Sequence, residues 1–137
     1  MIWLLDTNIC VYLINGNNQL MQKVREIGSL NLAVSHAVLA ELYYGAYNSS
    51  KVKSNLATIE AFSRHLTIFS DSVESARLFG KIKADLKRQG KPIEDFDVLV
   101  ASIAIANNCT LVTHNTSHFS RIAGLPVEDW LTPTDVF

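Results

Sequence analysis

The stretch MIWLLDTN at residues 1–8 decides the fold class. Met1–Leu5 is an apolar run short enough to be a buried strand, and the residue types in Asp6–Asn8 favour the N-terminus of a helix. Ile9–Ile14 is apolar enough to be the helix that follows. A buried strand that leads directly into a helix is typical of α/β proteins with parallel strands.

The same alternation continues along the chain. Further strands are expected at Leu30–Val34, Leu66–Phe69 and Thr110–Thr113, with an edge strand at Val127–Trp130. Helices are expected at residues 20–27, 36–45, 51–65, 73–88 and 95–107, with a short one within 114–121. We therefore expect a single domain over residues 1–137, with a mostly parallel sheet of four to five strands between two helical layers.

Composition favours a packed globular domain, with 48% hydrophobic and 18% charged residues among 137. The net charge of −1 argues mildly against a nucleic-acid binder, although an acidic metal site would cancel a basic surface in this sum. Cys10 and Cys109 lie in apolar runs without ligand spacing, so we interpret them as buried free thiols. Without an evident signal peptide or membrane span, we predict a cytosolic protein.

Polar residues follow two of the predicted strands. Asp6 comes directly after the first strand, and Thr113, His114 and Asn115 stand at the end of the fourth. In open parallel sheets, ligands bind beyond the carboxyl ends of the strands. These residues are therefore expected at the edge where a site forms.

Three carboxylates are candidates for that site: Asp6, Glu41 and Asp97. Asp6 and Asp97 have an alternative interpretation as helix caps, and Glu41 as an exposed helix position. Asp97 stands out because it begins the most apolar helix of the chain. Converging carboxylates repel one another, so a hard cation such as Mg²⁺ or Mn²⁺ would compensate them.

Other catalytic patterns are missing from the sequence. It contains no glycine-rich phosphate loop, no GxSxG motif and no HExxH motif, and its four histidines lack zinc-ligand spacing. This leaves metal-assisted phosphate chemistry as the favoured class. Two alternatives stay open: a non-catalytic RNA- or nucleotide-binding α/β module, and another metal-dependent enzyme, such as a housekeeping nuclease, a DNA nuclease or a phosphatase.

Motifs spread over almost the whole chain carry a family resemblance. They are LLDTN at residues 4–8, AELYYGA at 40–46, RQGKPI at 88–93, Asp97 with Ala101, LVTHNT at 111–116 with Phe119, and EDW at 128–130. Their order and spacing resemble the PIN-domain ribonucleases, and within them the VapC toxins of bacterial toxin–antitoxin pairs. The resemblance implies a parallel sheet with an acidic pocket at its carboxyl edge.

The resemblance also implies roles for individual acids. Asp6, Glu41 and Asp97 match the metal-binding and catalytic acids of the family. A fourth family acid is missing here, because Asn115 and His118 occupy the candidate positions. We therefore expect one Mg²⁺ or Mn²⁺ ion held mainly by Asp6 and Asp97, with Glu41 bound through water or acting on it.

Polar neighbours are expected to support these acids. Thr7, Thr113 and Asn8 are candidates for hydrogen bonds to the ligands. Asn115 either bonds a carboxylate or the substrate, or is a turn residue. His118 either faces RNA or is an ordinary surface histidine.

The implied function is that of a toxin that hydrolyses RNA, with initiator tRNA cut in its anticodon arm as the expected substrate. The implied partners are a VapB-type antitoxin and a second copy of the chain in a homodimer. A set of apolar residues either forms the antitoxin groove or belongs to the core: Tyr12, Leu13, Tyr43, Tyr44 and Phe62. Lys83 and Lys87 either bind RNA phosphates or line a solvated helix face.

Overall fold

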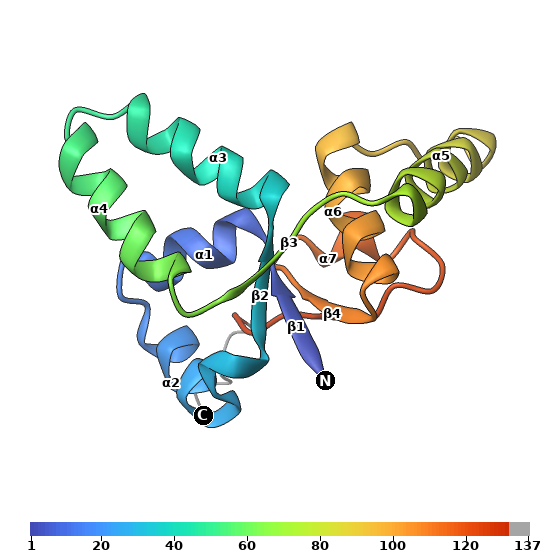
Figure 1. Cartoon of the computed structure of the whole chain (residues 1–137). Helices are drawn as coiled ribbons and strands as arrows, with labels where there is room; N and C mark the ends of the chain where they lie inside the picture. Colours follow the sequence, from blue (N-terminus) through green and yellow to red (C-terminus); the bar gives the residue numbers. More distant parts are fainter. Residues whose placement is uncertain (132–137) are drawn as a thin grey trace.

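The computed structural model describes residues 1–131, which form a five-stranded sheet with helices on both sides (Figure 1). The strands are β1 (Ile2–Leu5), β2 (Leu32–Ser35), β3 (Thr67–Phe69), β4 (Cys109–Val112) and β5 (Val127–Glu128). They lie in the order β3-β2-β1-β4-β5, and every neighbouring pair is parallel. The predicted α/β class and number of strands are confirmed.

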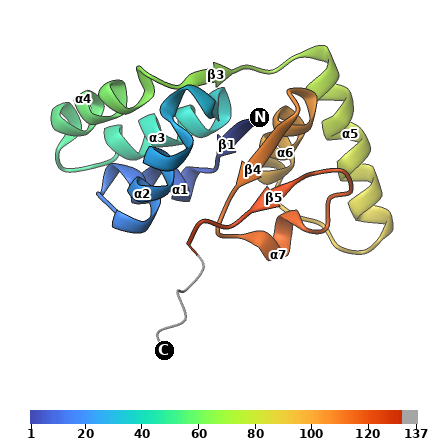
Figure 2. The same cartoon turned by 90° about the horizontal axis from the view of Figure 1, so that it is seen from below.

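The helices divide between the two faces of the sheet (Figures 1 and 2). One side carries α1 (Thr7–Ile14), α2 (Asn18–Ile27), α3 (His36–Tyr47) and α4 (Val52–Ser63), and the other carries α5 (Val73–Arg88), α6 (Asp95–Ala106) and α7 (Thr116–Phe119). From β1 to β2 and from β2 to β3 the chain moves in one direction across the sheet, and from β3 to β4 it moves back in the other direction. Because such crossovers are right-handed, the helices of the first two connections and those of the third lie on opposite faces. The strand order reverses between β1 and β4, which is where open α/β sheets bind ligands.

The core lies between the central strands and their flanking helices. All residues of β2 and β4 are buried, as are Leu4 and Leu5 at the end of β1. The apolar helix α6 is the most deeply buried one, as its sequence predicts, and it packs beside β4. Cys10 and Cys109 are buried free thiols, which confirms their interpretation.

Some element boundaries differ from the predicted ones. β2 begins at Leu32 and not at Leu30, because a 3₁₀ turn, η1 (Ser29–Asn31), leaves Leu30 89% exposed. α3 continues past Gly45 and ends at Tyr47, with Asn48 as its C-cap, since Gly45 keeps a helical backbone. β4 ends one residue before Thr113, and β5 is two residues long. No helix within residues 1–131 is long and apolar enough to cross a membrane.

Candidate active site

Asp6 lies at the switch point of the sheet, directly after β1. Its backbone N–H donates to the carbonyl of Val112 at 3.0 Å, which ties it to the end of β4. Its side chain is buried: Oδ1 accepts from the Thr7 backbone N–H at 2.8 Å, and Oδ2 accepts from the Thr113 hydroxyl at 2.9 Å. The first bond caps α1. The second joins Asp6 to the neighbouring strand, so capping alone does not account for this carboxylate.

Burial makes the charge of Asp6 costly. Desolvation raises the pKa of the Asp6 carboxyl above its usual range, against the opposing effect of its hydrogen bonds from Thr113 and Thr7. Thr113 is itself fully buried, and its hydroxyl also accepts from the Asn115 backbone N–H at 3.0 Å. The residues at the end of β4 therefore hold Asp6 in one orientation but provide no positive charge for it.

Asp97 lies in the first turn of α6, close to Asp6. Its side chain is largely buried, with 17% of its surface exposed. Its pKa is raised first by this burial, then by the negative charges of Asp6 and Glu94, while His118 acts in the opposite direction. The effect of Asp6 shows that the two carboxylates lie within each other's electrostatic range. Glu94 is the exposed N-cap of α6, and the sequence analysis did not assign it an effect on the site.

The segment after β4 borders the acid pair with Asn115 and His118. The side-chain amide nitrogen of Asn115 lies 2.8 Å from Nδ1 of His118, and that nitrogen lies 3.8 Å from Oδ2 of Asp97. His118 is therefore within ion-pair distance of Asp97, and it counteracts the rise in the pKa of Asp97 that burial causes. Asn115 and His118 thus border Asp97 at the positions where the family's fourth acid was expected.

Glu41 joins the site from α3. Its Oε2 atom accepts from the Thr7 hydroxyl at 3.2 Å, and the backbone N–H of Thr7 binds Asp6. Thr7 therefore links the two acids, although Glu41 remains exposed to solvent. Asn8 is exposed, and its side chain makes no hydrogen bond to the described part of the chain, so the structure does not connect it to the acids.

The donor set fits a single hard cation held through few protein ligands. Within residues 1–131, no three His, Cys, Asp or Glu side chains are close enough to hold a metal ion together. Among residues 1–131, no lysine or arginine pairs with Asp6 or Asp97. Mg²⁺ commonly binds one or two protein carboxylates while water and substrate phosphate complete its shell, so these two neighbouring carboxylates fit it. Glu41 is joined to Asp6 only indirectly, through Thr7, among the contacts of residues 1–131.

The two lysines predicted to bind RNA, Lys83 and Lys87, differ in their ion pairs. Both lie on the exposed face of α5. Nζ of Lys83 lies 3.0 Å from Oδ1 of Asp95, so its charge is partly neutralised. Lys87 has no ion pair among residues 1–131.

Fold and site together define a nuclease-like α/β domain with an acidic pair at the strand ends, and comparison with known proteins agrees. The model of the family described as "PIN domain" matches residues 3–125, so the chain belongs to the PIN-domain family. Nucleases of this family generally use divalent metal ions.

The relatives narrow this to the VapC branch. The Rickettsia felis protein named Ribonuclease VapC2 is 40% identical over 132 residues, covering 95% of this chain and 98% of that protein. The Shigella flexneri protein named tRNA(fMet)-specific endonuclease VapC is 35% identical over 128 residues, covering 93% and 97%. The solved structure of VapBC2 from Rickettsia felis, bound to a DNA fragment from its promoter, superposes with a TM-score of 0.90 at 39% identity, covering 95% of this chain and 99% of that one.

Proposed function

We propose that this chain is the toxin of a type II toxin–antitoxin pair and acts as a Mg²⁺- or Mn²⁺-dependent endoribonuclease. The buried pair of Asp6 and Asp97 carries the proposal, because burial and mutual repulsion leave these carboxylates in need of a cation. The names of the VapC relatives support RNA as the substrate. The name of the Shigella flexneri relative supports initiator tRNA, and the anticodon arm is our expected cleavage site.

In the proposed mechanism, each residue near the acid pair has a defined task. Asp6 and Asp97 would hold the ion, and a bound ion would supply polarisation of a phosphate oxygen and a more acidic water. Thr113 and the Thr7 backbone fix the orientation of Asp6. The Thr7 hydroxyl positions Glu41, which orients the attacking water and accepts its proton.

The proposed reaction is an in-line hydrolysis. The water oxygen forms a bond to phosphorus while the bond from phosphorus to the 3′ oxygen breaks. The 3′ oxygen takes a proton from solvent, which leaves a 5′-phosphate and a 3′-hydroxyl. The route does not use the 2′-hydroxyl as a nucleophile.

A VapB-type antitoxin is the proposed protein partner, because the similar solved structures from Rickettsia felis, Salmonella typhimurium and Haemophilus influenzae are VapBC structures. A groove of about 250 Å³ next to Glu41 is a candidate binding site for the antitoxin, and it runs between α1, α3 and α4. Its apolar lining is provided by Val11, Ile14, Leu42, Ala46 and Ile59. Of the residues predicted for this groove, Leu13, Tyr43 and Phe62 pack against the core instead, while Tyr12 and Tyr44 are exposed. The homodimer stays a prediction.

Cleavage of labelled initiator tRNA tests the enzyme proposal. The wild-type chain should cut with Mg²⁺ or Mn²⁺ and stop when EDTA is added. Asp97→Asn should reduce cleavage by on the order of a hundredfold. Asp95→Asn is the matched control, because this acid lies two residues away, is exposed and pairs with Lys83. Full cleavage by folded Asp97→Asn would refute the assignment.

Further outcomes separate the alternatives. A non-catalytic module would bind RNA and never cut it, whatever the metal. A housekeeping nuclease would be tolerated when expressed. The proposed toxin should stop growth, Asp97→Asn should not, and the product of a neighbouring small reading frame should restore growth of cells that express the wild-type chain.

A further inference from the structure

Positive charge is concentrated on and just after α5. Six of the twelve Lys and Arg residues fall between residues 77 and 91. Two of them are neutralised by nearby carboxylates, since Lys83 pairs with Asp95 and Arg88 pairs with Asp85. Lys87 and Lys91, at the end of α5 and in the turn towards α6, are exposed and have no ion pair among residues 1–131.

Arg121 brings a further cation to the same region from a distant part of the sequence. Its Nη1 atom donates to the carbonyl of Pro92 at 3.4 Å. Pro92 belongs to the turn that leads into α6, and the first turn of α6 carries Asp97. Arg121 comes three residues after His118, and it is His118 that lies beside Asp97. Arg121 therefore connects the two segments that border the acid pair.

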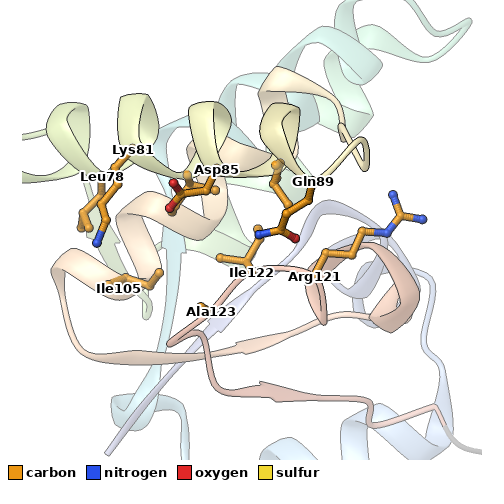
Figure 3. A pocket seen from close by; sticks show the side chains of 10 residues that line it. Leu78, Lys81, Asp85, Gln89, Ile105, Arg121, Ile122 and Ala123 are labelled. Carbon is orange, nitrogen blue, oxygen red and sulfur yellow. The ribbon is translucent and has the colours of Figure 1, made fainter.

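The side chain of Arg121 lies at the border of a cavity. It lines a cavity of about 130 Å³ between α5, α6 and the turn after α7 (Figure 3). The apolar lining of this cavity is Leu78, Ile82, Leu86, Ile105 and Ile122. Figure 3 shows the guanidinium group of Arg121 beyond the Gln89 end of the cavity, pointing away from it. The stem thus lies along the cavity while the charged fork faces solvent, where it can meet a phosphate.

We infer that Lys87, Lys91 and Arg121 form a phosphate-binding strip that holds the RNA strand beside Asp97. The inference rests on the proposed function. An acid pair repels a polyanion, so a nuclease needs fixed cations next to it, and phosphate is the anion that a planar guanidinium binds through two parallel hydrogen bonds. Within residues 1–131, Pro92 engages one nitrogen of Arg121, Nη1, so the guanidinium has further N–H groups that can bind phosphate.

Binding of labelled initiator tRNA at several salt concentrations tests the strip. The measurement uses an Asp97→Asn background, so that RNA stays intact. Adding Arg121→Gln should weaken binding about tenfold and reduce the slope of log affinity against log salt by roughly one. Arg121→Lys should lie in between, because lysine keeps the charge and loses the fork. Arg25→Gln, on α2 and away from α5 in Figure 1, should leave affinity and slope unchanged.

Kinetics and a second variant give independent readouts. In the cleavage-competent chain, Arg121→Gln should raise KM about tenfold, with kcat and the cleavage position near wild type. If Arg121→Gln lowers Tm, Lys91→Gln tests the same strip at an exposed position of the turn before α6.

Unchanged RNA affinity and salt slope in both variants would overturn the inference. A variant that binds RNA normally but no longer binds the co-expressed antitoxin would also overturn it, because the surface would then be a binding site for the protein partner. Failure of the proposed function looks different: the wild-type chain itself would cut no RNA. Cleavage by wild type together with an unaltered Arg121→Gln rejects the strip alone.

Discussion

At the scale of single residues, the site is governed by the cost of two buried negative charges. Asp6 and Asp97 both have raised pKa values, mainly through burial, and Asp97 also through the charge of Asp6. In the folded state these carboxyls hold their protons more tightly than in the unfolded chain. Their contribution to stability is therefore present below the ordinary carboxyl pKa of 3.8 and is lost as pH rises through the raised pKa.

We therefore predict that Asp97→Asn stabilises the metal-free protein at neutral pH. The variant removes one of two repelling charges, so its free energy of unfolding at pH 7 should exceed that of wild type by on the order of 1 kcal/mol. Urea unfolding in EDTA between about pH 4 and pH 8 should show wild type losing stability more steeply than the variant. If the free energies of unfolding of wild type and Asp97→Asn changed in parallel with pH, the fold would not disfavour the charged form of Asp97.

Thr113 provides a second prediction at this scale. Thr113→Val keeps the shape of the side chain but removes the hydroxyl that donates to Asp6 and accepts from Asn115. A buried acceptor and donor then lose their partner, so the variant should be destabilised by about 1–3 kcal/mol and lose most cleavage activity. Thr110→Val is the matched control, because Thr110 is a buried threonine within β4 whose hydroxyl, among residues 1–131, contacts only the sulfur of Met1 at 3.8 Å.

Equal Tm values for Thr113→Val and Thr110→Val would contradict this reasoning. The two threonines also illustrate what sequence predicts about single residues. Thr113 was placed near Asp6 because both end neighbouring strands, and their contact follows from the parallel register of β1 and β4. The link from Thr7 to Glu41 depends on how α3 packs against α1, which periodicity does not determine.

At the scale of elements, local patterns predict structure well where they are long and strongly periodic. α5 was predicted with its exact ends, because Ser72 caps its start and Gly90 takes the positive φ that its C-terminus requires. Short elements were less certain. β2 and β5 are defined by pairing with neighbours, so their ends depend on tertiary contacts that the apolar runs do not contain.

The elements also explain which functional residues the sequence missed. Lys83 and Lys87 were selected because they repeat along one helix face. The partner of Lys83 is Asp95, twelve residues later, and the cation that binds the turn before α6 is Arg121, from a turn beyond β4. Both facts arise from the packing of α5, α6 and the α7 turn against one another, which a helical pattern alone does not show.

At the scale of the whole molecule, the site joins segments that are far apart in the chain. Asp6 follows β1, Asp97 begins α6, and Thr113 follows β4, so the acid pair exists only when the sheet and its helical layer have assembled. A cation that binds this pair therefore binds the folded state and not the unfolded chain. Mg²⁺ or Mn²⁺ should raise the stability of the protein by mass action.

The expected size of this effect is about 2.7 kcal/mol at an ion concentration a hundred times the Kd. Thermal unfolding with increasing Mn²⁺ should show a rising Tm for wild type and little change for Asp97→Asn, which keeps only one of the two carboxylates. The double variant Asp6→Asn with Asp97→Asn should not respond at all. A matched rise in Tm for the double variant would place the ion elsewhere on the molecule. A response confined to wild type would tie the ion to the acid pair independently of any cleavage assay.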